Sequence, residues 1–186
     1  MDFFDNTTNK KMLVVGVLDI NGVLADVRKI SSARVRNKSP DLVLPNGQHV
    51  HYRPEMIKLY RHIERQCDTI IIFTSRLRKN AMPIIEDMSR KFGIKIPRLI
   101  LCGEDCKYRS DNEPWRPVKD TETVLCALEN VLSVKPTSVT FIDDNPERIK
   151  ITSDRPVAVS AIRIPTYDAA ATHVELDLQK LCIARK

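Results

Sequence analysis

Reactive side chains stand directly after the apolar runs of this chain, or directly before a helix start. They comprise three carboxylates, one hydroxyl and one ammonium group: Asp19, Asp143, Asp144, Thr74 and Lys119. In a parallel sheet that is covered by helices, ligands bind beyond the carboxyl ends of the strands. We therefore expect these five groups to meet at one edge of one sheet.

Such a cluster would favour one kind of chemistry. Carboxylates that lie close together repel one another unless a cation lies between them. Mg²⁺ takes oxygen ligands and is typically held by one or two carboxylates, water molecules and substrate phosphate. A carboxylate beside such a cation and a lysine is suited to attack phosphorus, and the Thr74 hydroxyl can donate to a phosphoryl oxygen. The residue types therefore favour phosphoryl transfer with Mg²⁺ as cofactor.

The first of these residues follows a run that is apolar on both faces. Residues 13–18 predict a buried strand, and Asp19 comes at its carboxyl end, just before Asn21 and Gly22. Taken alone, this stretch fits an ordinary strand and turn as well as it fits a reactive site. The rest of the chain decides between them.

Strands and helices alternate along the rest of the chain. Strands are predicted over residues 13–18, 69–73, 98–102, 138–142 and 157–164. Helices are predicted after Pro54, over residues 81–92, over residues 120–132 and over a closing segment, 174–182. Alternation with short connections predicts an α/β fold: a three-layer, Rossmann-like parallel sheet.

Two segments interrupt this alternation. Residues 25–50 are polar and contain the turn Pro45-Asn46-Gly47, which predicts a flap or hairpin. Residues 103–118 are too long for a simple connection and predict a small cap, in which Trp115 is interpreted as a packing residue. We expect one domain over residues 12–186, after a flexible tail over residues 1–11.

The composition favours an intracellular protein with acidic partners. The formal net charge of +6 suits phosphate esters or phosphoproteins, and basic runs such as residues 76–79 are interpreted as solvated surface rather than as a nucleic-acid footprint. No run is long enough for a membrane span, and no signal peptide is predicted. The five cysteines suit a reducing compartment, cytoplasmic or nuclear, and Cys102 and Cys106 do not complete a zinc site. A monomer is expected.

Five motifs give the chain a recognisable pattern: Leu18–Leu24, Tyr52-Arg53-Pro54, Ile72–Ser75, Val118-Lys119-Asp120 and Phe141–Pro146. In their order and spacing, the chain resembles the haloacid dehalogenase (HAD) superfamily. Within it, the chain is similar to the FCP/SCP-type phosphatases, which include the small RNA polymerase II C-terminal-domain phosphatases and the NLI-interacting-factor-like phosphatases. The likeness covers nearly the whole chain, from Leu13 to the predicted closing helix.

The resemblance implies an aspartyl-phosphate mechanism. Asp19 would be the nucleophile and a Mg²⁺ ligand. The other implied ligands are the backbone carbonyl of Asn21 and the side chain of Asp144, with Asp143 beside it. The phosphoryl group would be bound by Thr74, Ser75 and Lys119.

One position departs from the family pattern. These phosphatases generally have a second Asp two residues after the nucleophile, as general acid and base, and here that residue is Asn21. General acid–base catalysis is typically worth about 10²- to 10⁴-fold in rate. The role could pass to another group from the flap or cap, with four candidates: His49, His51, Glu104 or Asp105. Alternatively, the leaving group departs unaided, or the domain binds without catalysis.

Two hypotheses therefore stand. The first is a Mg²⁺-dependent phosphatase that acts on phosphoserine or phosphothreonine in a protein. The alternative is a weak or inactive domain of the same fold that binds a phosphoprotein or serves as a scaffold. The metal and phosphate ligands favour the first hypothesis, and Asn21 favours the second.

Overall fold

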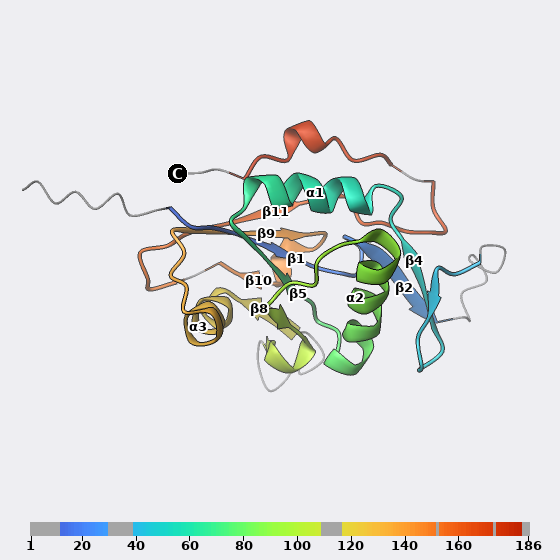
Figure 1. Ribbon diagram of the computed structural model, residues 1–186, viewed down its shortest axis with the longest axis horizontal. Coiled ribbons are helices and arrows are strands. Elements are labelled where there is room, and N and C mark those ends of the chain that lie inside the picture. Colours follow the sequence, from blue (N-terminus) through green and yellow to red (C-terminus); the bar gives the residue numbers. More distant parts are fainter. Residues whose placement is uncertain (1–11, 30–38, 109–116, 152, 173, 184–186) are drawn as a thin grey trace, which may run out of the picture.

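A five-stranded parallel sheet forms the centre of the protein. The computed structural model describes residues 12–29, 39–108, 117–151, 153–172 and 174–183. The strand order is β11-β9-β1-β5-β6 (Figure 1). The strands are β1 (Val14–Leu18), β5 (Thr69–Phe73), β6 (Ile100–Leu101), β9 (Ser138–Asp143) and β11 (Ala158–Arg163). The predicted α/β fold with a parallel sheet is confirmed.

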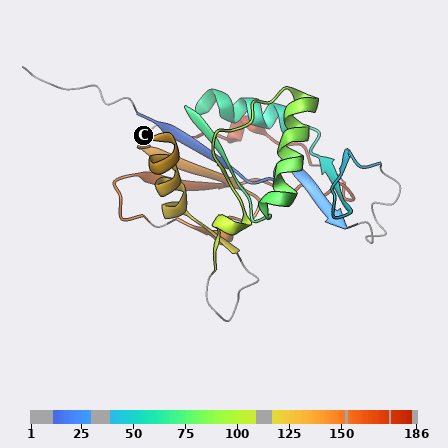
Figure 2. The ribbon, with the colours of Figure 1, turned by 60° about the horizontal axis from the view of Figure 1, so that its bottom comes forward.

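Helices cover both faces of this sheet (Figures 1 and 2). The helices are α1 (Met56–Gln66), α2 (Arg78–Phe92) and α3 (Thr121–Leu132). Since side chains alternate along a strand, β1 contributes to two separate cores. Val14 and Leu18 pack in one core with α1 and α2, whereas Val15 and Val17 pack in the other with α3. These are the three layers that the sequence predicts.

The end of α2 and the start of α3 coincide with the capping residues expected there. Gly93 follows α2 in the left-handed conformation, with φ of 64°, and its N–H donates to the Ser89 carbonyl. At the start of α3, the Asp120 carboxylate accepts a hydrogen bond from the N–H of Glu122. This cap fixes the backbone one residue after Lys119.

Two smaller sheets flank the central one. The flap is antiparallel, in the order β2-β4-β3, with β2 (Ala25–Lys29), β3 (Leu42–Val43) and β4 (Gln48–Tyr52). The cap has the order β10-β8-β7, with β7 (Lys107–Tyr108), β8 (Pro117–Asp120) and β10 (Ile149–Lys150) after the short 3₁₀ turn η2 (Gly103–Asp105). The pattern of the sequence does not predict β10. The predicted tail, Trp115 and part of the flap lie outside the described residues.

The predicted closing helix is wrong. Residues 174–183 contain only a 3₁₀ turn, η4 (Leu178–Lys180). Side chains of α1 bind the backbone here, since Gln66 Oε1 accepts the Ile183 N–H at 2.7 Å and His62 Nε2 lies 2.8 Å from the Leu181 carbonyl oxygen. Leu181 and Ile183 are buried. Long-range contacts with α1 thus replace the local hydrogen bonds of a helix.

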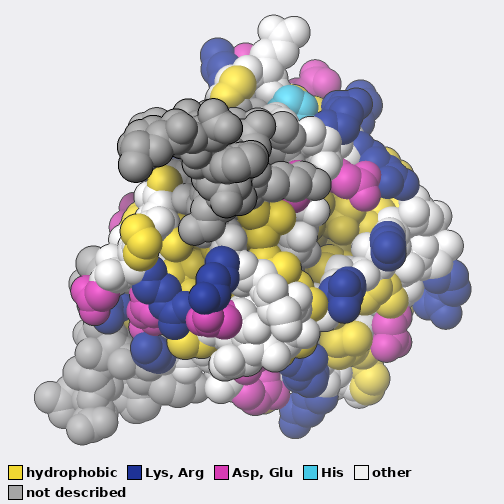
Figure 3. Space-filling view, turned by 60° about the vertical axis from the view of Figure 1, so that its left-hand side comes forward, with side chains coloured by type: hydrophobic (Ala, Val, Ile, Leu, Met, Phe, Trp, Pro, Cys, Tyr) yellow, Lys and Arg dark blue, Asp and Glu magenta, His cyan; other side chains and the backbone are white. Residues whose placement is uncertain are grey.

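The surface is mixed in charge. On the face shown in Figure 3, Lys and Arg side chains are scattered among acidic and apolar ones and form no continuous stripe. None of the helices in the described part of the chain is long and apolar enough to cross a membrane.

Candidate active site at the carboxyl edge of the sheet

Asp19 lies at the carboxyl edge of the central sheet. Leu18 is paired with Ile72 of β5 and with Ile142 of β9, so the residues that follow these three strands emerge at the same edge. The Asp19 N–H donates to the Ile142 carbonyl at 3.2 Å, and Asp19 Oδ1 accepts the Ile20 N–H at 2.7 Å. The carboxylate is therefore held in place, and its residue is only 8% exposed.

Lys119 lies between two carboxylates. Its Nζ is 3.1 Å from Asp19 Oδ2 and 2.6 Å from Asp143 Oδ2. Lys119 is buried and comes from β8 of the cap, where it is paired with Ile149 of β10. The cap sheet thus brings an ammonium group to the edge at which β1 and β9 end.

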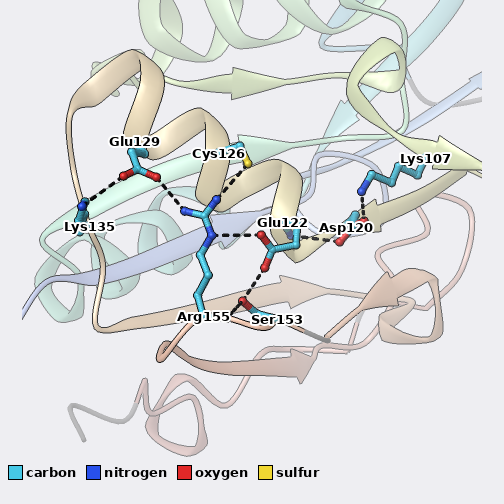
Figure 4. A network of polar contacts seen from close by, with 8 residues as sticks. All are labelled: Lys107, Asp120, Glu122, Cys126, Glu129, Lys135, Ser153 and Arg155. Carbon is cyan, nitrogen blue, oxygen red and sulfur yellow. Dashed lines mark hydrogen bonds and ion pairs between the residues drawn. The ribbon is translucent and has the colours of Figure 1, made fainter.

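A network of charges holds the segment that carries Lys119 (Figure 4). The buried carboxylate of Asp120 lies 2.5 Å from Lys107 Nζ of β7. Glu122, on the first turn of α3, binds Ser153 Oγ at 2.6 Å and Arg155 Nε at 3.2 Å. We call this the α3 network, and its charged members are Lys107, Asp120, Glu122, Glu129, Lys135, Lys150 and Arg155.

Asp144 brings a third carboxylate to the site. Asp19, Asp143 and Asp144 each offer an oxygen atom, and these oxygen atoms all lie within 4.8 Å of one another. Asp144 Oδ2 accepts a hydrogen bond from Thr166 Oγ1 at 2.9 Å, and Asp143 Oδ1 accepts the Asn145 N–H at 2.8 Å. Both carboxylates are therefore oriented by neighbouring groups.

The electrostatics of this cluster favour a further cation. Burial raises the pKa of Asp19, which Lys119 lowers in part and Asp143 raises further. Burial also raises the pKa of Asp144, and Asp143 again contributes to the rise. Burial lowers the pKa of Lys119, but Asp19 and Asp143 outweigh it and the pKa is raised overall. One ammonium group faces three carboxylates, and carboxylate oxygens are the ligands that Mg²⁺ prefers.

Gly22 is required by this arrangement. Its φ is +79°, and a Cβ atom built there would lie 2.2 Å from Asp144 Oδ2. Its carbonyl oxygen accepts hydrogen bonds from Arg53 Nη2 at 2.9 Å and from the Tyr167 N–H at 2.7 Å. A side chain at this position would displace the Asp144 carboxylate.

Thr74 emerges at the same edge, directly after β5. It is fully buried, and its Oγ1 accepts the N–H of Arg76 at 3.3 Å. Ser75, between them, is exposed. The cap approaches this turn closely, because the Gly103 N–H donates to the Arg76 carbonyl at 2.6 Å and a Cβ at Gly103 would lie 2.7 Å from the Ser75 carbonyl oxygen.

Asn21 points its amide oxygen at the flap. Its Oδ1 accepts the Val27 N–H of β2 at 3.0 Å, while the residue as a whole is exposed. The side chain thus connects the turn after β1 to the flap. An amide cannot exchange a proton as a carboxyl group does, so this position supplies no general acid.

Two of the four candidate substitutes for a general acid are engaged elsewhere. Both carboxylate oxygens of Glu104 accept the Arg78 N–H at 3.0 Å, at the start of α2. Asp105 Oδ2 accepts the Cys102 N–H at 2.8 Å. His51 is fully buried in β4, and His49 is partly buried two residues earlier on the same strand.

Two residues near the site were not predicted. Thr166, which donates to Asp144, lies in a segment without a recognisable motif. Arg76 belongs to a basic run that is interpreted from the sequence as solvated surface, yet it is partly buried. Its position two residues after Thr74 was the available signal.

A comparison with a solved structure supports the fold. One match is the structure of Fcp1, an essential RNA polymerase II CTD phosphatase, with 13% identity and a TM-score of 0.52, covering 86% of this chain and 43% of that one. Another is a variant of fission yeast RNA polymerase II CTD phosphatase Fcp1 bound to beryllium fluoride, with 12% identity and a TM-score of 0.48, covering 76% and 41%. The chain thus spans less than half the length of either.

Comparisons of sequence identify the family. No curated protein matches the chain. The model of the NLI interacting factor-like phosphatase family, however, matches residues 14–181, which include every element of the central sheet and the whole carboxylate cluster. The chain therefore belongs to the NLI interacting factor-like phosphatase family.

Proposed function

We propose that this protein is a Mg²⁺-dependent phosphatase that forms an aspartyl-phosphate on Asp19, with phosphoserine or phosphothreonine in a protein as substrate. The observation that carries the proposal is the buried Lys119 ammonium, 3.1 Å from Asp19 and 2.6 Å from Asp143, beside the third carboxylate, Asp144. Family membership supports the phosphatase reaction. The substrate class is an inference from the same relationship.

The reaction has two steps. In the first, a carboxylate oxygen of Asp19 attacks phosphorus, the bond from phosphorus to the serine or threonine oxygen breaks, and the departing oxygen takes up a proton. In the second, water attacks the phosphorus of the aspartyl-phosphate and the bond to Asp19 breaks. This step releases inorganic phosphate and one proton and restores the carboxylate.

The residues around Asp19 would bind the phosphoryl group. Lys119 supplies a positive charge, and the Thr74 hydroxyl and Ser75 supply hydrogen-bond donors for the phosphoryl oxygens. The burial of Lys119 and Thr74 strengthens these interactions, because charges interact more strongly away from water.

Four residues would hold the metal ion. The carboxylates of Asp19, Asp143 and Asp144 fit Mg²⁺, because their oxygens lie within 4.8 Å of one another and one ammonium leaves them with excess negative charge. The backbone carbonyl of Asn21 is the fourth proposed ligand. When bound, Mg²⁺ would supply positive charge for the phosphoryl oxygens.

A second candidate function rests on Asn21. Its amide oxygen accepts the Val27 N–H, and it offers no proton to the leaving group. A domain with this residue would form or hydrolyse the aspartyl-phosphate slowly. The alternative is therefore a weak or inactive phosphatase fold that binds a phosphoprotein or serves as a scaffold.

The test is turnover of an aryl phosphate by the purified protein in the presence of Mg²⁺. Aryl oxides are good leaving groups, so the assay does not depend on a general acid at position 21. We expect turnover that Asp19→Asn abolishes and that EDTA removes. Activity unchanged by Asp19→Asn would contradict the role of Asp19, and absence of turnover together with phosphopeptide binding would support the alternative.

A further inference from the structure

The side chain of Arg76 extends from the turn after β5 to the flap. Its Nη1 donates to Gln48 Oε1 of β4 at 3.0 Å, and its Nη2 donates to the Val27 carbonyl of β2 at 3.4 Å. Both acceptors are neutral. The two terminal nitrogens are thus held by the flap, but the positive charge is not neutralised by them.

Arg76 differs in this respect from Arg28 and Arg155, which form ion pairs. Arg28 lies 2.7 Å from Asp26 and 2.6 Å from Asp168, and Arg155 lies 2.8 Å from Glu129. Among the described residues, no carboxylate forms an ion pair with Arg76, and no acceptor lies within hydrogen-bond distance of its buried Nε. A partly buried cation without a counter-ion is costly, because water is removed and no anion replaces it.

The backbone of Arg76 belongs to the candidate active site. Its N–H donates to Thr74 Oγ1 at 3.3 Å, and its carbonyl accepts the Gly103 N–H of the cap at 2.6 Å. Burial lowers the pKa of Arg76, and the charge of Asp19 raises it in part. The backbone of Arg76 therefore lies beside Thr74, at the edge of the sheet where Asp19 lies.

We propose that Arg76 is a substrate-binding residue that contacts the phosphate bound next to Asp19. It adds a second positive charge to that of Lys119, and its Nε–H is the donor left open for a phosphoryl oxygen. A guanidinium suits this role, since its planar donors match the geometry of phosphate oxygens. The proposal rests on the proposed function, because that function places a phosphate at this edge of the sheet.

The flap gains a role from this arrangement. Gln48 and Val27 fix the plane of the guanidinium, so that the charge stays oriented before a ligand arrives. Preorganised donors bind an anion without the cost of ordering a long side chain. Loss of the Gln48 acceptor would therefore weaken phosphate binding less than loss of the charge itself.

The test is the affinity for inorganic phosphate, measured by calorimetry in the presence of Mg²⁺. Arg76→Gln removes the charge, and we expect a loss of about 10- to 100-fold, as for a hydrogen bond to a charged group. Arg78→Gln is the matched control, because it removes the same charge two residues along, from a side chain that donates to the Ile100 carbonyl. It is expected to change the affinity less than about 2-fold.

A second measurement does not depend on the stability of the glutamine variant. The Nε–H resonance of Arg76 is observed by NMR in the wild-type protein and assigned by its loss in Arg76→Lys. We expect it to shift on titration with inorganic phosphate, whereas the Arg78 resonance stays in place. Equal phosphate affinity of wild-type protein and Arg76→Gln, or an Arg76 resonance that does not respond, would overturn the proposal.

These outcomes are distinct from those of the phosphatase test. Phosphate binding that depends on Arg76, in a protein without turnover, would support this proposal and the binding alternative together. Turnover that depends on Asp19, with phosphate binding unaffected by Arg76→Gln, would support the phosphatase and remove Arg76 from the site.

Discussion

The carboxylate cluster and the α3 network differ in how their acidic side chains are paired with basic ones. In the cluster, Lys119 forms ion pairs with Asp19 and Asp143, whereas Asp144 forms no ion pair with another described residue. In the α3 network every acidic side chain has a basic partner: Asp120 pairs with Lys107 and Lys150, Glu122 with Arg155, and Glu129 with Arg155 and Lys135. Each carboxylate of the network thus has a basic partner, whereas one carboxylate of the cluster has none among the described residues.

This difference separates a structural group of charges from a functional one. Both groups contain close ion pairs, so a short distance between opposite charges does not identify a site. We expect burial together with an unpaired carboxylate to mark a binding site, because perturbed titratable groups gather at functional sites. The four predictions below test this distinction.

The largest expected effect is that of removing Lys119. Lys119→Met leaves two buried carboxylates without their ammonium, and we expect a loss of about 3–5 kcal/mol in the free energy of unfolding, with loss of turnover. Lys135→Met is the control in the α3 network. Lys135 Nζ lies 3.3 Å from Glu129 Oε1 in an exposed ion pair, which should contribute less than about 1 kcal/mol to the free energy of unfolding. Denaturant unfolding measures both. Equal losses would remove the distinction between the two groups.

Asn21→Asp adds a fourth carboxylate to the cluster and restores a proton donor. An Asp oxygen can still accept the Val27 N–H, so the fold should tolerate the change. With alkyl phosphates, which are poor leaving groups, we expect turnover to rise by about 10²- to 10⁴-fold. Asn130→Asp, at an exposed position on α3, adds the same charge away from the flap and should not change turnover. Without a gain, another residue must already transfer the proton.

Gly22→Ala and Gly93→Ala separate backbone strain from an effect on the site. Both glycines have positive φ, and we expect each change to cost about 1–2 kcal/mol in stability. A Cβ at Gly22 also meets Asp144, whereas a Cβ at Gly93 meets nothing within 4 Å. Only Gly22→Ala should lower the Mg²⁺ affinity, by about 10-fold or more, in a calorimetric titration. An unchanged affinity would contradict the role of Asp144 as a ligand.

The two groups should also differ in their response to pH. Burial raises the pKa of Asp120, but the hydrogen bond and charge of Lys107 outweigh burial, so the pKa lies below its ordinary value of 3.8. The ionised Asp120 therefore stabilises the fold above pH 3.8, and this stabilisation is lost as pH falls through the lowered pKa. Asp144 has a raised pKa, chiefly through burial. The contribution of Asp144 to stability is fully present below the ordinary carboxyl pKa and is lost as pH rises through its raised pKa.

The measurement is the free energy of unfolding of the wild type and of the two variants, in EDTA, between about pH 3 and pH 7. Relative to the wild type, Asp144→Asn should gain stability as pH rises and Asp120→Asn should lose it. The effect is the smallest of the four, since each variant reports a single carboxyl group. A change in the same direction for both variants would contradict the contrast.

The predictable part of the molecule is the part with local signals. Apolar runs predicted the strands that carry Asp19 and Thr74, because a strand buried on both faces leaves a continuous apolar run in the sequence. The helix-start signal at Asp120, the N-cap residue of α3, predicted the position of Lys119 directly before the helix. The family resemblance, confirmed by the family model, was needed to order these residues into a mechanism, and those roles stay predictions.

The remainder depends on contacts between distant segments. The prediction of a closing helix was wrong because Gln66 and His62 of α1 bind the backbone of residues 181 and 183. Arg76 was interpreted as surface because its acceptors, Gln48 and the Val27 carbonyl, lie 28 and 49 residues away in the chain. No local pattern reports such contacts, and they decide which charges are compensated.

The carbonyl of Gly22 also bears on how the protein is made. It is bound by Arg53 and by the N–H of Tyr167, a residue far along the chain from Gly22. Contacts between residues so far apart in sequence form late in folding. On the ribosome, which releases the amino-terminal part first, Asp19 would emerge long before the segment that fixes the turn after it. The nascent chain should therefore acquire its ligand-binding capacity only after the segment around Tyr167 has left the ribosome.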